Sequence, residues 1–568
     1  MHIHIVPNRD AAPTVLLRES YRDGKKVGKR TLANLSSLSP TQISSIRAIL
    51  RGDELRPVAD TFEIRSSRAH GHVQAVSLAM RRVGFASLIS SKPCRERDLV
   101  LAMVASRIIA PATKLSTTRL WHNNTLAQDF GVADATEDDL YGAMDWLLAG
   151  QDRIQKKLAS RHLREDGLVL YDLSSSYMEG EHCPLAKIGY SRDEKRGTLQ
   201  VNYGLMTDDH GCPVAISVFD GNTSDSTTFL PQVQMLRDQF GIRTMVMVGD
   251  RGMISNKAID EMRQDTGVDW VTALKTASIR TLIEQKHLQL DLFDERNLLE
   301  ITSPDFPGER LVACRNLELA KRRAHTRDAL LLATEEELQK IKVRVANGKL
   351  VGQDHIGLAV GKVINQRKMA KHFTLSITED SFCFTRLAAH IAAEAALDGL
   401  YIIRTSVNAE RMDSETCVRT YKSLAQVERA FRSLKTMDLK VRPIHHRLEN
   451  RVRAHIFLCM LAYYVEWHMR EAWRELMFAD EDQAAKQVRD PVATAKRSIK
   501  ALKKVHGRTL EDGTPAHSFK TLMEELATIT RNTCSTPGNT GHNSTFEIIT
   551  ASTAKQKRAL ELIDGILM

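Results

Sequence analysis

Three acidic residues far apart in the sequence have the residue type and the setting that a metal-dependent nuclease needs. Asp172 lies near the end of the apolar run 168–173, and Asp250 closes a second apolar run, 245–250. Both runs have the composition of buried strands, where a carboxylate without a partner is costly. Glu428 lies in a basic segment with helical spacing. Together the three predict a cage for divalent cations, and hard oxygen ligands favour Mg²⁺ or Mn²⁺.

Phosphodiester chemistry with two divalent ions needs carboxylates that hold the metals about 3.5–4 Å apart. One ion then activates the attacking water or hydroxyl, and the other stabilises the leaving oxygen. A carboxylate on a central strand can be shared by both ions, and we assign that role to Asp172. Asp250 and Glu428 would close the cage on its two sides. Taken singly, either aspartate could instead cap its strand or pair with an arginine.

The segment around Glu428 is predicted to be one helix that carries five residues on a single face. They are spaced three or four apart: Tyr421, Leu424, Glu428, Phe431 and Lys435. Glu428 could bind metal while Lys435 holds a phosphate and Tyr421 stacks on or bonds to a nucleotide. For Phe431 a place in the core is the better interpretation. The further predicted DNA-binding residues are Arg429, Arg432 and Arg251, the last of which could instead neutralise the carboxylates.

The charge of the chain indicates a polyanionic partner. The net charge is +10 over 568 residues, and the basic surplus is concentrated around Glu428. Residues 411–453 contain eleven Lys and Arg against five Asp and Glu. This concentration is where a phosphate backbone would have to approach.

The strand pattern around the two aspartates predicts an α/β core of the ribonuclease-H-like type. Apolar runs at 168–173, 198–207 and 214–219 are separated by turns and read as consecutive antiparallel strands. A helix over 227–240 follows, then further strands at 244–248 and 268–274. Three antiparallel strands followed by strand–helix units give the order of a mixed ribonuclease-H-like sheet, here preceded by a mainly helical region.

We expect six regions along the chain, consistent with its length. The first contains a basic hairpin at 14–33 that could bind DNA or serve packing. The regions are an N-terminal hairpin region (1–69), a helical domain (70–165), the first part of the core (166–276), an insertion domain (277–396), the second part of the core (397–475) and a helical tail (476–568). Within the tail, 532–544 is rich in Thr, Asn, Ser and Gly and is expected to be a flexible linker.

Other features exclude several classes of protein. The eight cysteines include no Cys-x-x-Cys pair, so neither a zinc site nor a disulfide framework is predicted. His210 and Cys212 have no second pair of ligands nearby in sequence, and His445-His446 is expected to face solvent or phosphate. The longest apolar stretch, 455–467, is too short to span a bilayer. No signal peptide is visible, and the expected location is the cytoplasm, in association with the nucleoid.

The motifs resemble those of bacterial insertion-sequence transposases of the DDE class, in the insertion-sequence-four superfamily. The signature of that superfamily is Tyr-x2-Arg-x3-Glu-x6-Lys, and Tyr421, Glu428 and Lys435 match it. Leu424 stands at the Arg position, so Arg432 or Lys422 would have to replace the DNA contact. Four further segments resemble the family: 171–176, 219–225, 249–253 and 442–447.

The resemblance implies cleavage of DNA at the terminal inverted repeats of an insertion sequence, followed by joining of the freed 3′ ends to target DNA. It also implies two Mg²⁺ or Mn²⁺ ions and a homodimer that holds both DNA ends. Two alternatives remain open: a ribonuclease-H-like nuclease that never joins strands, and a DNA-binding regulator descended from a transposase. An aspartyl-phosphate phosphatase is disfavoured because Ser174 stands two residues after Asp172, where that chemistry needs a second aspartate.

Overall fold

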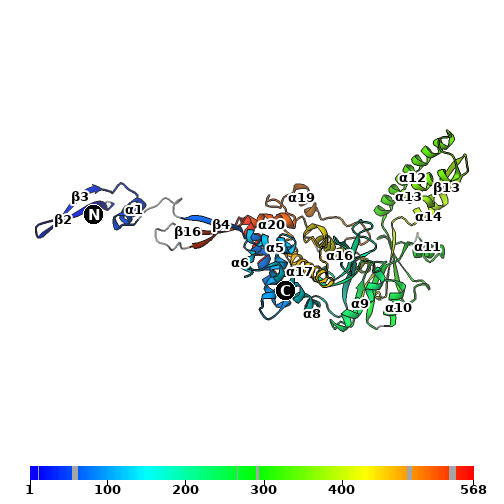
Figure 1. Cartoon of the computed structure of the whole chain (residues 1–568), viewed down its shortest axis with the longest axis horizontal. Coiled ribbons are helices and arrows are strands. Elements are labelled where there is room, and N and C mark those ends of the chain that lie inside the picture. Colours follow the sequence, from blue (N-terminus) through cyan, green and yellow to red (C-terminus); the bar gives the residue numbers. More distant parts are fainter. Residues whose placement is uncertain are drawn as a thin grey trace. The chain divides into compact units, whose positions relative to one another are not determined.

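The computed structural model describes residues 1–9, 12–53, 62–264, 266–289, 293–482, 489–535 and 545–567. These residues form two compact units (Figure 1). The first, hereafter the N-terminal unit, comprises Met1–Arg68 and Ile529–Ala551. The second, hereafter the main unit, comprises Ala69–Thr528 and Ser552–Met568.

The N-terminal unit contains two small sheets. The predicted hairpin is present: β2 (Thr14–Asp23) pairs antiparallel with β3 (Lys26–Asn34), β1 (His2–Val6) adds a third strand, and α1 (Pro40–Arg51) follows. The second sheet has the order β17-β16-β4 and is built from β4 (Glu63–Ala69), β16 (Thr530–Ser535) and β17 (Thr545–Ile549).

This second sheet corrects part of the expected flexible linker at 532–544. Residues 532–535 belong to strand β16, while 536–544 lie outside the described residues. Thr533 pairs with Glu547 and Cys534 with Phe546 across β16 and β17. Thr is common in strands, but Asn and Gly are depleted there, so the composition of the segment favoured a linker.

A sheet with ribonuclease-H-like strand order forms the centre of the main unit. Its strands are β5 (Gly167–Tyr177), β7 (Leu199–Thr207), β8 (Pro213–Asp220), β9 (Met245–Val248) and β10 (Val268–Ala273). They lie in the order β8-β7-β5-β9-β10. The first three are antiparallel, and β9 is parallel to both β5 and β10. The predicted fold class, a ribonuclease-H-like mixed sheet, is therefore confirmed.

One face of this sheet is covered by α9 (Asp225–Asp238) and α10 (Asn256–Gln264). Val169, Tyr171 and Leu173 of β5 enter the apolar core on that side. Because successive residues of a strand point to opposite faces, Asp172 points to the other face. There α16 (Leu424–Arg432) packs against β5 and β7.

The expected insertion at 277–396 divides into two parts. One part extends the sheet, because β11 (Leu298–Ile301) and β12 (Arg310–Arg315) continue it beyond β15 (Leu400–Thr405), which pairs with β10. The other part lies outside the sheet around its own apolar core (Figure 1). Its elements are α12 (Leu317–Ala346), α13 (Gln353–Arg367), η3 (Ala370–His372), β13 (Phe373–Ile377), β14 (Phe382–Arg386) and α14 (Ala388–Ala395). The helix that precedes β11 is α11 (Thr276–Glu284).

The helical region before the sheet packs around the long helix α17 (Glu449–Ala472), which is buried along most of its length. Helices α4 and α7 and strand β8 all contact α17. The helices of this region are α2 (Gly71–Arg82), α3 (Phe85–Ile89), α4 (Arg95–Ile109), α5 (Lys114–Leu120), η2 (Trp121–Asn123), α6 (Leu126–Asp129), α7 (Glu137–Ala149) and α8 (Gln151–His162). The remaining elements of the main unit are β6 (Lys187–Ile188), α15 (Ser414–Lys422), η4 (Ser433–Met437), α19 (Ile499–Gly507), α20 (Phe519–Ala527) and α21 (Ala554–Asp564).

Among the described residues, no single helix is both long and apolar enough to cross a membrane. By length and composition alone, the pair formed by 95–109 and 114–123, bent by 87°, could do so. Most of the first helix of that pair is buried in the main unit.

Candidate active site

The sheet brings Asp172 and Asp250 to the same level of two neighbouring strands. Leu170 of β5 is paired in parallel with Val248 of β9. Each aspartate follows its paired residue by two positions, so the two lie at the same level, Asp172 within β5 and Asp250 beyond the end of β9. Asp172 is partly buried, whereas Asp250, just beyond the end of β9, is exposed. The strand pairing therefore joins two residues that are distant in sequence.

Glu428 reaches this end of the sheet from α16. Val427, Ala430 and Phe431 are the buried residues of that helix, and the Phe431 ring lies 5.8 Å from the ring of Tyr203 on β7. The predicted place of Phe431 in the core is therefore confirmed. Glu428 itself is exposed, beside the buried Val427.

The prediction of one helix that carries the five residues on a single face is wrong. Ser423 separates α15 from α16, and α16 passes into the π-helical segment η4 at Ser433. A π-helical turn adds a residue to the helical period and so rotates the positions that follow it. Lys435, in η4, is buried while Glu428 is exposed.

The three carboxylates lie close enough to act on one another electrostatically. The pKa of Asp172 is raised to about 7, chiefly because burial disfavours its charge. The charges of Asp250 and Glu428 raise it further, while the Leu173 amide, 2.8 Å from Oδ1 of Asp172, and Arg192 oppose them. In the described part of the chain, no Lys or Arg forms an ion pair with any of the three.

Tyr421 completes the group from the end of α15. Its hydroxyl donates a hydrogen bond to Oδ1 of Asp250, at 3.2 Å. Burial raises the pKa of Tyr421, and the negative charges of Asp250 and Glu428 act in the same direction. The hydroxyl therefore stays protonated and can orient the Asp250 carboxylate. This group of oxygen donors, which has no ion-paired Lys or Arg among the described residues, fits divalent cations.

Comparison with known proteins identifies the family. The model of the transposase DDE domain matches residues 165–465, which include all three carboxylates. The chain belongs to the insertion-sequence DDE transposases. A second model, the N-terminal domain of IS1634 family transposases, matches residues 3–59. The transposase therefore acts on DNA and depends on divalent metal, as that class does.

A search of curated proteins finds no match to this transposase. Among solved structures, it is similar to a chain in the cryo-EM structure of the piggyBac transposase synaptic complex with hairpin DNA. That match has 9% sequence identity and a TM-score of 0.32, and covers 80% of this chain and 77% of the other. A TM-score of this size is too low to support a shared fold, which rests here on the strand order and the family model.

The structure gives Lys435 a different partner from the predicted phosphate. Its Nζ lies 2.8 Å from Oδ1 of Asp193, which Arg442 also contacts. The Asp193 side chain is buried, and its Oδ2 accepts the amide hydrogen of Tyr177 on β5 at 3.1 Å. Burial lowers the pKa of Lys435 and the Asp193 charge opposes that shift. Lys435 thus ties the end of the Glu428 helix to β5, a positioning role that the signature alone did not predict.

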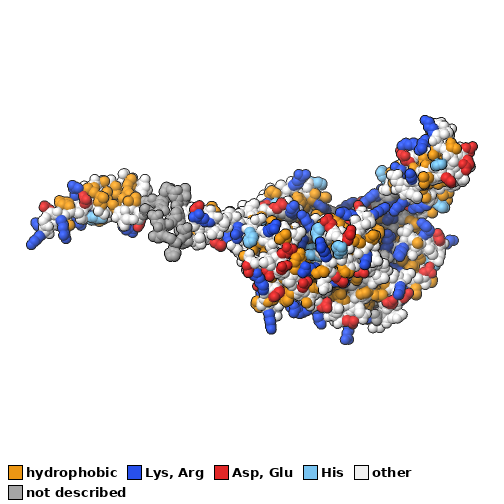
Figure 2. Space-filling model, viewed as in Figure 1, with side chains coloured by type: hydrophobic (Ala, Val, Ile, Leu, Met, Phe, Trp, Pro, Cys, Tyr) orange, Lys and Arg blue, Asp and Glu red, His pale blue; other side chains and the backbone are white. Residues whose placement is uncertain are grey.

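The cations proposed to replace the signature arginine differ in their availability. Lys422 donates hydrogen bonds to the backbone carbonyls of Pro491, Val492 and Ala493, so it does not serve as a free DNA contact. Arg251, Arg429 and Arg432 are exposed. Figure 2 shows that Lys and Arg also gather on the viewed face where α12 leaves the rest of the main unit. Exposed residues at the start of that helix are Lys321, Arg322 and Arg323.

A buried polar network holds the far end of the Glu428 helix against α17. The Ser433 hydroxyl donates to Asp438 Oδ2 at 2.6 Å and lies 2.7 Å from Glu466 Oε1. Arg470 donates to both carboxylates, at 2.5 Å to Glu466 and 2.6 Å to Asp438. This network was not predicted from the sequence, because Glu466 and Arg470 lie in an otherwise apolar helical segment.

The adjacent histidines do not share one environment, contrary to the expectation that both face solvent or phosphate. His445 is exposed and lies 3.6 Å from Glu179. His446 packs against the rings of Tyr141 and His455, and burial lowers its pKa to about 3. His446 is therefore a neutral packing residue of the transposase.

Proposed function

We propose that this transposase cleaves DNA at the terminal inverted repeats of an insertion sequence and joins the 3′ ends to target DNA. Asp172, Asp250 and Glu428 are the proposed catalytic residues and the ligands of two Mg²⁺ or Mn²⁺ ions. The observation that carries the proposal is the convergence of three carboxylates on one end of the sheet with no Lys or Arg paired to them among the described residues. The charges of Asp250 and Glu428 add to the effect of burial in raising the pKa of Asp172, and bound divalent cations would relieve that repulsion.

Each residue has a distinct task in this proposal. Asp172, on the central strand between the other two, offers its carboxylate to both ions. Asp250 is oriented by the Tyr421 hydroxyl. Glu428 supplies the third carboxylate from a helix fixed by Phe431 and the Ser433 network. Divalent cations at such a site activate the attacking oxygen and stabilise the leaving oxygen of the phosphodiester.

Exposed cations around the carboxylates would hold the DNA backbone. Arg429 and Arg432 lie on the same helix as Glu428, and Arg251 follows Asp250 directly. These guanidinium groups suit phosphate oxygens. Tyr421, whose hydroxyl bonds to Asp250, is the proposed contact for a nucleotide. A homodimer that holds both element ends is the proposed working assembly.

The test is strand cleavage and strand joining with Mg²⁺ or Mn²⁺, using DNA ends from either side of the gene. Wild-type protein is compared with Glu428→Gln, which removes the charge and keeps the side-chain shape. Glu410→Gln is the matched control, because Glu410 is an exposed glutamate on the loop before α15. We expect cleaved and joined products from the wild type and the control, and none from Glu428→Gln, with DNA binding retained in all three.

Other outcomes would identify other functions. Cleavage without joining would overturn the transfer step and favour a ribonuclease-H-like nuclease. Binding without cleavage by any of the three proteins would favour a DNA-binding regulator. Equal cleavage by wild type and Glu428→Gln would remove Glu428 from the catalytic group.

A further inference from the structure

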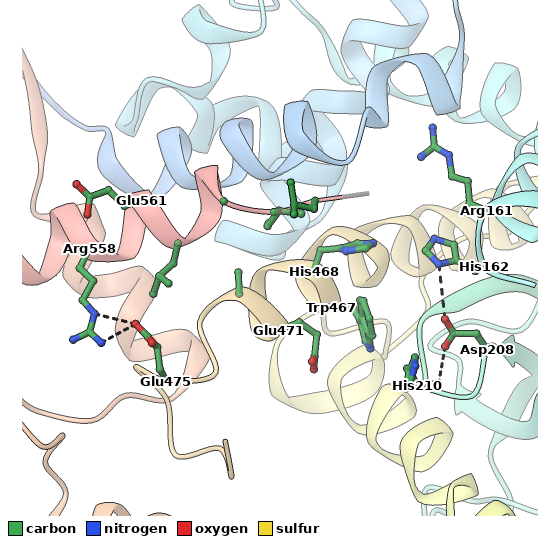
Figure 3. A pocket seen from close by; sticks show the side chains of 15 residues that line it. Arg161, His162, Asp208, His210, Trp467, His468, Glu471, Glu475, Arg558 and Glu561 are labelled. Carbon is green, nitrogen blue, oxygen red and sulfur yellow. Dashed lines mark hydrogen bonds and ion pairs between the residues drawn. The ribbon is translucent and has the colours of Figure 1, made fainter. Parts of the chain in front are cut away.

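A second group of metal-binding residue types lies elsewhere in the main unit. His162 ends helix α8, Cys212 directly precedes strand β8, and His468 lies on α17. One donor atom from each lies within 4.8 Å of the other two. Figure 3 shows His162 and His468 next to each other at one end of a cavity of about 800 Å³. Three elements that are distant in sequence therefore meet at a nitrogen–nitrogen–sulfur donor set.

The spacing of the donors suits one small cation. Sγ of Cys212 lies 3.9 Å from Nε2 of His162. Bonds of about 2.3 Å from zinc to sulfur and about 2.0 Å to nitrogen, at a tetrahedral angle, would separate these atoms by about 3.5 Å. A shift of a few tenths of an ångström would therefore bring both atoms to ligand distance. Imidazole and thiolate together favour Zn²⁺ over Mg²⁺.

His468 gives an independent indication that a ligand is required. Its Nε2 is buried and has no hydrogen-bond partner in the described part of the chain, although the residue is only 8% exposed. A buried polar atom without a partner is costly and uncommon in native proteins. A metal bond would satisfy a histidine nitrogen at this place.

Asp208 is placed to orient two of the donors. Its Oδ1 accepts the backbone amide hydrogens of His210 and Cys212, at 2.9 and 2.8 Å, and so fixes the turn that presents the thiol. Its Oδ2 lies 3.8 Å from Nδ1 of His162 (Figure 3). The Cys212 thiol lies near the other ring nitrogen, Nε2. A carboxylate behind a metal-bound histidine is the usual support of such a ligand.

The Tyr464 hydroxyl is the present neighbour of Nε2 of His162, at 3.1 Å. A metal would displace it from that nitrogen, and the guanidinium of Arg161 is a second hydrogen-bond partner for the hydroxyl. In the metal-free protein, burial lowers the pKa of His162 and His468 to about 4 and about 3 and raises the pKa of the Cys212 thiol. The rings are therefore neutral and the thiol is protonated at pH 7, so a metal must displace the thiol proton.

In the part of the chain that the structure describes, a second cysteine–histidine pair, on α17, lacks the third donor that the first group has. Sγ of Cys459 also lies 3.9 Å from a histidine nitrogen, Nε2 of His455. That nitrogen lies 3.1 Å from the Val441 carbonyl oxygen, and no third donor joins the pair within the described residues. Cys459 is therefore a matched control for Cys212.

The geometry points to a Zn²⁺ site formed by His162, Cys212 and His468, with Asp208 as the supporting carboxylate. Binding transfers the thiol proton of Cys212 to solvent and forms one Zn–S and two Zn–N bonds. Both histidines line the cavity, so a water molecule can take the fourth position. The metal would link α8, the β7–β8 turn and α17, and so fasten the helical region to the sheet.

The test uses the full-length protein, stripped of metal and titrated with Co²⁺ as a spectroscopic substitute for Zn²⁺. We expect a thiolate-to-cobalt charge-transfer absorption in the near ultraviolet at one equivalent, abolished by excess Zn²⁺. Cys212→Ser should lose this absorption, and Cys459→Ser should keep it. Zn²⁺ should also raise the Tm of the wild type and of Cys459→Ser.

Some outcomes would overturn the site directly. If the wild type shows no charge-transfer absorption, the proposed site is excluded. This result does not depend on whether any variant folds. An absorption that survives in Cys212→Ser but is lost in Cys459→Ser would place the metal at the other pair. Should Cys212→Ser fail to fold, His162→Gln replaces it, since that side chain is 12% exposed and borders the cavity. Unchanged Co²⁺ affinity in His162→Gln would also contradict the assignment.

Discussion

The carboxylate group and the His162–Cys212–His468 group both lie in the main unit but have different donor atoms. The first has only oxygen donors, two of them on exposed residues, and none of its carboxylates is ion-paired with a Lys or Arg among the described residues. The second has nitrogen and sulfur donors, is largely buried, and is neutral without metal. An exposed oxygen site can exchange ions and admit a phosphodiester, whereas a buried nitrogen–sulfur site suits a permanent ion. Donor chemistry and burial together therefore distinguish an exposed, exchangeable metal site from a buried one.

Loss of the Glu428 carboxylate should abolish strand cleavage and leave metal binding at the other group unchanged. Glu428→Gln should lower strand cleavage by at least about 10³-fold, because one ligand of the reactive ions is lost. The same variant should keep the cobalt charge-transfer absorption, since Glu428 belongs only to the carboxylate group. Parallel cleavage assays and Co²⁺ titrations measure both quantities. Loss of the absorption in Glu428→Gln would mean that the centres are not independent.

A smaller effect is expected from the carboxylate that supports His162. Asp208→Asn should weaken Zn²⁺ binding by about 10–100-fold, because the amide keeps the hydrogen bonds to the turn but not the charge behind the ring. Asp209→Asn is the control, as Asp209 lies near the exposed His210 instead, at 3.6 Å. Competition with a zinc chelator gives the affinities. Equal affinities for the two variants would remove Asp208 from the site.

The charge on Asp172 should make the metal-free protein less stable as pH rises. Its pKa of about 7 lies above the ordinary 3.8, so the folded state binds the proton more tightly than the unfolded state does. Stability is therefore lost as pH rises from about 4 to about 7. Allowing for partial exposure, Asp172→Asn should gain about 1–2 kcal/mol in free energy of unfolding at pH 8 and little at pH 4. Urea unfolding at both pH values, without metal, measures this; equal gains at both would contradict the raised pKa.

The smallest effect concerns the hydroxyl on Asp250. Tyr421→Phe removes one hydrogen bond to a carboxylate and keeps the ring, so cleavage should fall by about 3–15-fold. If the hydroxyl orients a metal ligand, the Mg²⁺ concentration needed for half-maximal cleavage should rise as well. Cleavage rates over a Mg²⁺ series separate this from a loss of DNA binding. An unchanged rate and an unchanged Mg²⁺ requirement would leave Tyr421 with no positioning role.

The candidate site could be proposed from sequence because Asp172 lies near the end, and Asp250 at the end, of an apolar run that predicts a strand. The two strands pair in parallel; β9 ends two residues before Asp250, whereas β5 continues past Asp172 to Tyr177. The strand order of the core followed from the same runs. What sequence could not give was the π-helical segment after Arg432, which turns Lys435 inward to Asp193. Helical spacing assumes a constant period, and that assumption failed there.

The nitrogen–sulfur group was inaccessible for a different reason. His210 and Cys212 were judged against neighbours in sequence, where no second pair of ligands exists. The actual neighbours of Cys212 come from the end of α8 and from α17, and only tertiary packing brings them together. Likewise β11 and β12 lie in a charged segment, and their place beside β15 depends on long-range pairing. Local composition carries little information on contacts of this kind.

The pairing of β4 with β16 has a consequence for the order in which the protein is made. Strand β4 is synthesised early, but its partner begins at Thr530, close to the end of the chain. During translation, β4 therefore has an open edge while the whole main-unit sheet emerges from the ribosome. A product of premature termination before Ile529 would contain all three carboxylates and yet lack the strands that complete the N-terminal unit.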